Sequence, residues 1–344
     1  MDNRFCQVAE PSAIYMCMRT VALGNEGMRS SVLGFGCSAV LGRVGRKDSL
    51  AALSAAFEAG ITFFDTARSY GYGESEGLLG EFLQGRRVSV VISTKFGILP
   101  AKNNILKQSL KPLARKLLQL MPSVREVMQG QIAAQFSEGH FSVAALRESL
   151  ETSLRALRTD YVDLLFMHEP PVNVLQQDDL FAALERLVAE GKIRRYGIAS
   201  HPPVVLVNLA EAFKTIQFPC NLFELGLARM PAAVGSDVVT IANNPFGGGQ
   251  RISESKALLT SLSRDRSAPA ELREKLRVVD DVVLADAVLN AVTRNTSIQV
   301  VIPSMMQLDH LRANVVAIEH SRFSSEELYW LRNAIGGNTH QQLM

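Results

Sequence analysis

Three short apolar segments of this chain each end on an ionisable side chain, and this pattern constrains the fold more than any other feature. The segments are residues 61–65, 90–95 and 162–168, which end on Asp65, Lys95 and His168. Tyr70 follows shortly after Asp65. In a parallel barrel the strand interiors are apolar, whereas the residues at the carboxyl ends of the strands open onto one mouth. We therefore expect Asp65, Tyr70, Lys95 and His168 to converge at the mouth of such a barrel.

These four side chains together can perform acid–base chemistry. A lysine ammonium close to a tyrosine is expected to lower the phenol pKa from about 10 by roughly 1 to 3 units. Tyr70 can then exchange a proton with a carbonyl oxygen near neutral pH. Asp65 is expected to hold Lys95 in place, and His168 to donate to the same oxygen and orient it. This combination predicts carbonyl reduction with hydride from a nicotinamide.

At these residues the chain resembles the aldo-keto reductase superfamily. Residues 65–71 match its Asp-Thr-Ala-x-x-Tyr-Gly segment, residues 93–97 its lysine motif and residues 160–168 its histidine motif. Further matching stretches are residues 32–36, 191–194 and 301–303, with Leu311 and Asn314 beyond them. The likeness extends over about residues 18 to 335. It implies an α/β fold: a (β/α)8 TIM barrel with an N-terminal hairpin, a long insertion after the third barrel strand and a C-terminal helix.

Length and composition agree with one barrel of this kind. The chain has 344 residues, 47% of them hydrophobic, and one large barrel needs about 250. We expect residues 1–19 to be a flexible leader and residues 20–344 a single domain. The net charge of +2 gives no reason to expect nucleic acid binding, and no apolar run reaches the roughly 18 residues of a membrane span.

The four cysteines show neither paired spacing nor the spacing of metal ligands. They are Cys6, Cys17, Cys37 and Cys220. We therefore expect reduced thiols in a cytoplasmic protein, with no metal site.

The rest of the chain predicts the remaining barrel elements. Apolar spacing of three and four, with glycines and charges at the ends, predicts helices near residues 50–60, 78–84, 146–157, 179–190, 284–292 and 308–318. Short apolar runs between them predict further strands at residues 195–200, 238–242 and 298–302, and one that ends near residue 217. Ser324 and Glu327 form a capping-box pattern for a last helix that is expected to end at Gly336. Residues 250–281 are polar with mixed charge, so we expect a second mobile loop over the site.

Residues 98–140 are far longer than the usual loop between a strand and a helix, and should form an insertion at the barrel mouth. Its first part interleaves basic residues with leucines. Three interpretations remain open: a cover for the barrel rim, a helix for a partner or a membrane surface, and a lid over the substrate.

Cofactor binding rests on the resemblance, because the barrel has no G-x-G-x-x-G fingerprint. By position in the family, Ser200 and Gln217 should face the nicotinamide amide, and Asp65 should touch the ribose. Asn243 stands where a tyrosine often stacks on the nicotinamide. The glycine-rich segment that follows, with Asn244, Phe246 and Gly247, lets the backbone approach a ligand closely.

The segment after the last predicted strand departs from the family pattern. Many members hold the adenosine 2′-phosphate with lysine or serine and, six residues later, arginine; the corresponding positions here are Ser304, Met305 and His310. Hydroxyl and imidazole groups supply less fixed charge than lysine and arginine. Arg312 lies nearby in sequence, and Asn314 occupies a matching cofactor position. The predicted cofactor is NADP, with NAD possible.

The leading hypothesis is an NAD(P)H-dependent oxidoreductase that interconverts an aldehyde or ketone and an alcohol, with Tyr70 as general acid and base. The same site can run oxidatively, as a sugar or alcohol dehydrogenase. The altered cofactor positions favour a third possibility, a nicotinamide-binding regulatory subunit with little turnover, although the complete set of four residues speaks against it. The substrate is expected to be a small carbonyl compound or sugar, while its identity, the direction and the oligomeric state stay open.

Overall fold

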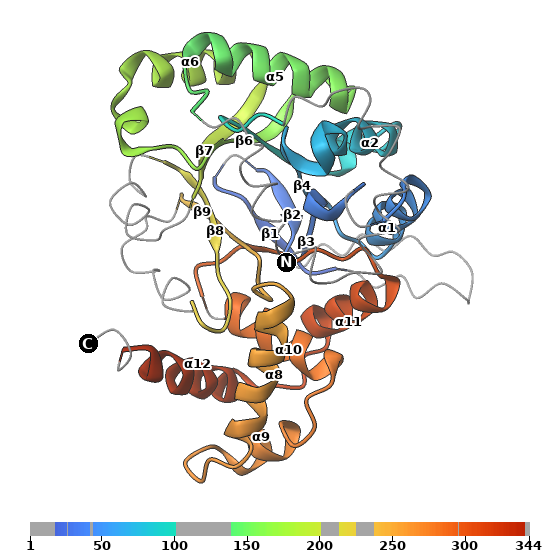
Figure 1. Cartoon of the computed structure of the whole chain (residues 1–344), viewed down its shortest axis with the longest axis vertical. Coiled ribbons are helices and arrows are strands. Elements are labelled where there is room, and N and C mark those ends of the chain that lie inside the picture. The colour runs from blue at the N-terminus through green and yellow to red at the C-terminus, as the bar shows by residue number, and fades with distance from the viewer. Residues whose placement is uncertain are drawn as a thin grey trace, which may run out of the picture.

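Eight parallel strands form the barrel in this computed structural model, which describes residues 18–25, 27–41, 44–100, 139–200, 213–224, 237–294 and 296–340. The strands are β3 (Gly34–Gly36), β4 (Phe63–Asp65), β5 (Val91–Phe96), β6 (Val162–His168), β7 (Ile193–Ala199), β8 (Thr215–Pro219), β9 (Val239–Asn243) and β10 (Val300–Ile302). Each is hydrogen-bonded to its neighbours in chain order, and a bridge between Leu33 and Val301 joins the two outer strands (Figure 1). The predicted fold class is confirmed.

The N-terminal hairpin consists of β1 (Thr20–Ala22) and β2 (Arg29–Ser31), which pair antiparallel as predicted. Leu23 and Met28, in the turn between them, pack into an apolar cluster with residues that point into the barrel, such as Leu164. Gly24 has a φ of +73°, and a Cβ there would lie 2.1 Å from the Arg195 guanidinium. The hairpin thus fills the amino-terminal end of the barrel, the end opposite the predicted site.

Helices cover the outside of the barrel. They are α1 (Arg46–Glu58), α2 (Ser75–Phe82), α5 (Val143–Leu157), α6 (Asp178–Ala189), α10 (Asp281–Thr293) and α11 (Leu308–Glu319). Each buries apolar residues at the predicted helical spacing, for example Leu146 and Leu150 on α5. At Gly80 on α2, a Cβ would lie 2.2 Å from the Ala156 carbonyl oxygen, so only glycine permits this close approach to α5.

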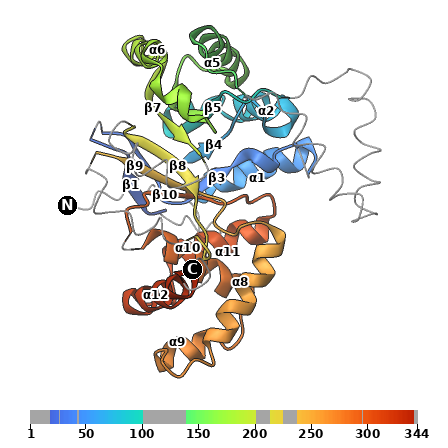
Figure 2. The ribbon, with the colours of Figure 1, turned by 60° about the vertical axis from the view of Figure 1, so that its left-hand side comes forward.

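Residues 250–281 form two helices joined by short connections, and the expectation of a single mobile loop is wrong for them. They contain α8 (Gly249–Leu262) and α9 (Ala270–Lys275), which extend away from the barrel (Figure 2). A few leucines at helical spacing lie within this segment of mixed charge. Leu259 and Leu262 on α8 are buried three residues apart, and Leu272 on α9 and Leu276 just after it are buried four apart. A few leucines are enough to dock both helices.

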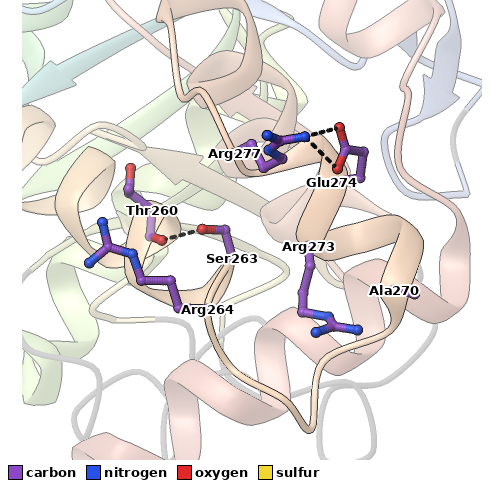
Figure 3. A pocket seen from close by; sticks show the side chains of 7 residues that line it. All are labelled: Thr260, Ser263, Arg264, Ala270, Arg273, Glu274 and Arg277. Atoms are coloured by element: carbon purple, nitrogen blue, oxygen red, sulfur yellow. Dashed lines mark hydrogen bonds and ion pairs between the residues drawn. The ribbon is translucent and has the colours of Figure 1, made fainter.

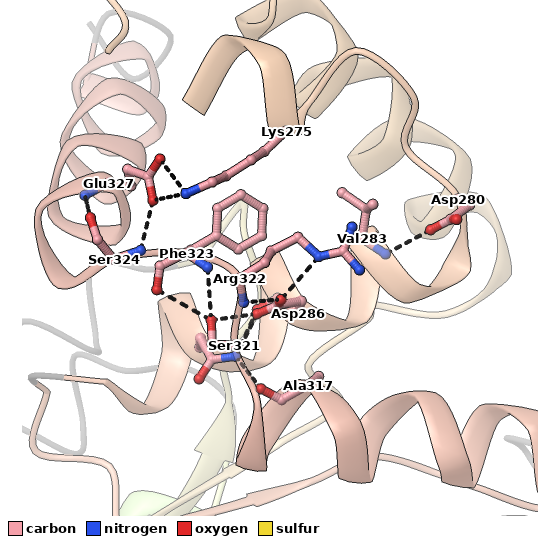
Figure 4. A network of polar contacts seen from close by, with 11 residues as sticks. Lys275, Asp280, Val283, Asp286, Ala317, Ser321, Arg322, Phe323, Ser324 and Glu327 are labelled. Carbon is pink, nitrogen blue, oxygen red and sulfur yellow. Dashed lines mark hydrogen bonds and ion pairs between the residues drawn. The ribbon is translucent and has the colours of Figure 1, made fainter. Parts of the chain in front are cut away.

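The last helix, α12 (Ser325–His340), begins with the predicted capping box. The Ser324 amide donates to Glu327 Oε2 at 2.7 Å, and the Glu327 amide donates to Ser324 Oγ at 3.1 Å (Figure 4). The helix continues beyond Gly336, where it was expected to end, because glycine lowers helix stability without preventing the conformation.

Two predictions concern chain outside the described residues. The proposed leader (1–19) and the insertion (98–140) fall mostly on residues 1–17 and 101–138, which the described ranges leave out. Among the helices of the described ranges, none combines the length and the apolar character needed to cross a membrane.

Candidate active site

Asp65, Tyr70, Lys95 and His168 lie together at the carboxyl ends of neighbouring strands. Asp65 ends β4, Lys95 is the penultimate residue of β5 and His168 ends β6. Tyr70 begins a short 3₁₀ helix, η2 (Tyr70–Gly73), after β4. Lys95 Nζ is 4.8 Å from the centre of the Tyr70 ring, and the His168 ring meets the phenol edge-on with centres 6.2 Å apart. The structure thus brings the four predicted residues into one group.

Asp65 and Lys95 form a buried ion pair. Lys95 Nζ donates to Asp65 Oδ1 at 2.7 Å and to Oδ2 at 2.8 Å, and also to the Thr66 carbonyl at 2.9 Å. The two residues are 4% and 2% exposed. Burial of Lys95 lowers its pKa, but the charges of Asp65 and Tyr70 and the hydrogen bonds to them raise it by more. The pKa of Lys95 therefore lies above its usual value, and the ammonium stays charged.

The Tyr70 pKa lies above its usual value, contrary to the predicted lowering. Burial of the phenol raises the pKa most, while the charge and hydrogen bond of Lys95 lower it and the charge of Asp65 raises it. Sequence reasoning identified the lysine effect but not the burial that outweighs it. In this structure Tyr70 therefore keeps its proton at neutral pH, which is the form that can donate.

Two polar residues near the group were not predicted as site residues. Ser93 Oγ donates to Asp65 Oδ1 at 2.7 Å. It lies two residues before Lys95, on the same face of β5, so strand periodicity was a usable signal. Glu169, directly after His168, has a left-handed φ of 51° and accepts a hydrogen bond from Ser200 Oγ at 3.3 Å. Nothing in the sequence indicated that conformation.

The two predicted amide-facing residues lie beside Asp65. Gln217 is fully buried, and its Nε2 donates to Asp65 Oδ1 at 3.0 Å. Its Oε1 is buried and has no hydrogen-bond partner among the residues that the structure describes. The Ser200 amide donates to the Gln217 carbonyl at 3.1 Å, which places the two residues side by side.

The segment after β9 makes a tight turn into α8. Asn243 ends β9, and the Gly247 amide donates to the Asn244 carbonyl at 3.0 Å. Gly247 has a φ of +67°, and a Cβ there would meet the Arg251 side chain at 2.6 Å, so glycine is required. Phe246 is partly buried against the core. Behind this turn the first amides of α8 point out of the helix end, as helix geometry dictates.

The residues predicted near an adenosine phosphate are partly exposed and partly buried. Ser304 follows β10 and His310 lies in the first turn of α11, and both are exposed. Met305 and Asn314 are buried. Arg312 is 3.4 Å from Asp309 in the same helix. An ion pair of Lys256 and Asp281 (2.6 Å) lies close by, and its hydrogen bond and charge, together with the charge of His310, lower the Asp281 pKa.

The sequence profile of the aldo/keto reductase family matches residues 32–335. The chain belongs to the aldo/keto reductase family. The uncharacterized oxidoreductase YqkF of Bacillus subtilis is 26% identical over 332 residues, covering 92% of this chain and 96% of that protein. L-galactose dehydrogenase of Arabidopsis thaliana is 32% identical over 190 residues, covering 53% of this chain and 48% of that enzyme.

Solved structures of aldo-keto reductases share the fold of this chain. One from Klebsiella pneumoniae in complex with NADPH has a TM-score of 0.64 and 23% identity, and the match covers 93% of this chain and 96% of that one. Family membership makes this chain an NAD(P)-dependent oxidoreductase.

Proposed function

We propose that this chain interconverts a carbonyl compound and an alcohol by hydride transfer, with Tyr70 as the acid in reduction and the base in oxidation. One observation carries the proposal: Lys95 Nζ holds both oxygens of Asp65 at 2.7 and 2.8 Å while it lies 4.8 Å from the Tyr70 ring centre. A buried phenol beside a fixed ammonium can give up a proton and keep the resulting phenolate stable.

Each of the four residues has a separate part in the proposed reaction. The protonated Tyr70 donates to the carbonyl oxygen, and Lys95 stabilises the phenolate that remains. Asp65 holds the ammonium in position and keeps it charged. His168, edge-on to the phenol, orients the carbonyl oxygen beside the Tyr70 hydroxyl. In oxidation the same groups act in reverse order.

The residues around Gln217 fit a nicotinamide. Its buried Oε1, without a hydrogen-bond partner in the described chain, can accept from the carboxamide nitrogen, and Ser200 stands beside it. Asn243 would lie against the ring, while Asn244, Phe246 and Gly247 would lead the pyrophosphate to the amino end of α8. Ser304, His310 and Asn314 would contact the adenosine side. When bound, the reduced cofactor supplies the hydride.

We propose NADP as the cofactor, with NAD also accepted. The complex of a structural relative with NADPH supports this choice. The exposed Ser304 and His310 would give only a small preference for NADP over NAD, because they supply little fixed positive charge for the 2′-phosphate. The second candidate function is oxidation of a sugar or alcohol, which the name of the related L-galactose dehydrogenase favours.

The test is to mix the purified chain with NADPH or NADH and a panel of aldehydes and ketones, and with NADP or NAD and a panel of sugars and alcohols. Turnover is read from nicotinamide absorbance. Turnover that is lost in Tyr70→Phe supports the proposed site. Cofactor binding without turnover in either direction contradicts it and favours the regulatory subunit.

A further inference from the structure

Helices α8 and α9, with the residues that follow each of them, line a cavity of about 510 Å³ that lies outside the barrel and is open to solvent. Its lining consists of Thr260, Ser263, Arg264, Ala270, Arg273, Glu274 and Arg277 (Figure 3). The lining thus includes three arginines and a single carboxylate, a net positive charge of two. The cavity is at the carboxyl end of α8, and the proposed pyrophosphate position is at the amino end, about 20 Å away at 1.5 Å per residue.

Only one of the three arginines has its charge neutralised by direct contact. Arg277 Nη1 lies 3.0 and 3.2 Å from the two oxygens of Glu274. Arg264 and Arg273 have no hydrogen bond or ion pair within the described residues, and Arg273 Nε is buried without a partner. Asp265 Oδ1 accepts hydrogen bonds from Ser267 N and Oγ, both at 2.8 Å, and these bonds lower the Asp265 pKa. The charge of Arg273 lowers it as well, but without a direct contact. Two guanidinium groups thus remain available to a ligand.

The hydroxyl groups of the lining do not compete for that role. Thr260 Oγ1 donates to the Lys256 carbonyl at 2.8 Å, and Ser263 Oγ donates to the Thr260 carbonyl at 2.7 Å. Their protons are therefore used within α8. The donors that can face a ligand belong to arginine, whose planar fork matches phosphate oxygens.

The walls of the cavity are anchored to the rest of the protein. Leu272 is fully buried beneath α9, and Leu259 beneath α8. Lys275, at the end of α9, donates to both oxygens of Glu327 at 2.8 Å, and Glu327 also caps α12 (Figure 4). The arginines are therefore carried on backbone that needs little rearrangement to bind, which reduces the entropy cost of binding.

We propose that this cavity binds a phosphate-bearing small molecule. The two available guanidinium groups match the charge of a phosphate dianion, and bidentate contacts make arginine a strong phosphate partner. A cavity of about 510 Å³ is within the range of small-molecule sites and leaves room for an organic group beside the phosphate. The proposal is independent of the catalytic function and of the cofactor.

The probe is inorganic pyrophosphate, titrated calorimetrically into the full-length chain and into variants. We expect Arg264→Gln/Arg273→Gln to weaken binding at least tenfold. Arg266→Gln, which removes an exposed arginine from the same connection but not from the cavity, should bind like the wild type. Arg273→Lys, which keeps the charge and loses the fork, should bind between the two. If the double variant is unstable, the single variant Arg264→Gln, at an exposed position, should still show a measurable loss.

A titration of NADP into the same variants separates this cavity from the cofactor site. Arg264→Gln/Arg273→Gln should bind NADP at the cofactor site like the wild type while it loses affinity for pyrophosphate. Equal pyrophosphate affinity in the wild type and in Arg264→Gln, or an equal loss of NADP and pyrophosphate binding in the double variant, would overturn the proposal.

Discussion

Asp65 and Asp163 are both buried aspartates on barrel strands, paired with basic side chains, yet they lie at opposite ends of the barrel. Asp163, 1% exposed near the start of β6, accepts from the Ile92 amide at 2.8 Å and contacts Arg87 at 2.9 Å and Arg194 at 3.3 Å. Both arginines also lie over the Tyr161 ring, at 3.9 and 5.0 Å. These contacts join β6 to β5 through Ile92 and to β7 through Arg194, and they hold Arg87 of the segment that precedes β5.

The partners of Asp65, in contrast, have contacts or bonding capacity besides Asp65 itself. Lys95 also lies against the Tyr70 ring, and Gln217 carries an amide oxygen that has no hydrogen-bond partner in the described chain. Burial and pairing are therefore common to a structural cluster and to a candidate active site. The two clusters differ because the group around Asp65 combines an amide oxygen without a hydrogen-bond partner in the described chain, a phenol and an imidazole, and the group around Asp163 does not combine these.

The largest expected effect comes from Tyr70→Phe. Loss of the proposed proton donor should lower turnover by roughly a hundredfold or more, while cofactor affinity measured by calorimetry stays near the wild-type value. Tyr161→Phe is the matched control at the other end of the barrel and should keep normal turnover. Near-normal turnover of Tyr70→Phe would show that Tyr70 is not the acid.

Lys95→Met should lower turnover by at least about tenfold and change its pH dependence. Lys95 lowers a Tyr70 pKa that burial has raised, so its removal moves that pKa further up. Reduction needs the protonated phenol, and its rate falls as the pH rises past the pKa. The falling limb of the profile should therefore shift to higher pH. A profile with the same limb in both proteins would rule out Lys95 as the tuning group.

Asp163→Asn is expected to affect stability and not catalysis. Breaking a buried ion pair costs about 3 kcal/mol of unfolding free energy, and here it leaves Arg87 without its carboxylate. Denaturant unfolding measures the loss, and turnover per folded molecule should stay unchanged. A large fall in that turnover would remove the distinction between the two ends of the barrel.

Gln217→Leu should weaken cofactor binding by roughly five- to tenfold, since one hydrogen bond contributes about 1 to 1.4 kcal/mol and tenfold corresponds to 1.4 kcal/mol. Calorimetric titration of NADP and of NAD should show the same loss for both, because the amide end is common to them. An effect on one cofactor alone would place Gln217 elsewhere.

The smallest effect is the choice between NADPH and NADH, which we expect to differ by less than about tenfold in affinity. Ser304 and His310 are exposed, and the acidic Asp281 lies close enough to His310 to be affected by its charge. A thousandfold preference for NADPH, about 4 kcal/mol, would reveal a phosphate clamp that these residues do not provide.

The sequence predicted those features that follow from local pattern. Strand-end positions placed Asp65, Lys95 and His168 together, and Ser324 and Glu327 cap α12 as their spacing indicated. Features that depend on tertiary burial were not predictable. The Tyr70 pKa is raised because the fold encloses the phenol, and α8 and α9 are held by a few leucines within a polar segment. No local pattern in the sequence indicated that Arg87 and Arg194 would meet at Asp163.

The seam between β3 and β10 has a consequence for synthesis on the ribosome. Few contacts join the two strands, among them the bridge between Leu33 and Val301 and the hydrogen bond from the Val301 amide to the Val32 carbonyl at 2.9 Å. The ring can therefore close only after β10 has been made, roughly tens of seconds after β3 at 5 to 20 residues per second. Strands β4, β5 and β6 are consecutive and can pair earlier. The nascent chain should thus bring Asp65, Lys95 and His168 together before β10 pairs with the free edge of β3.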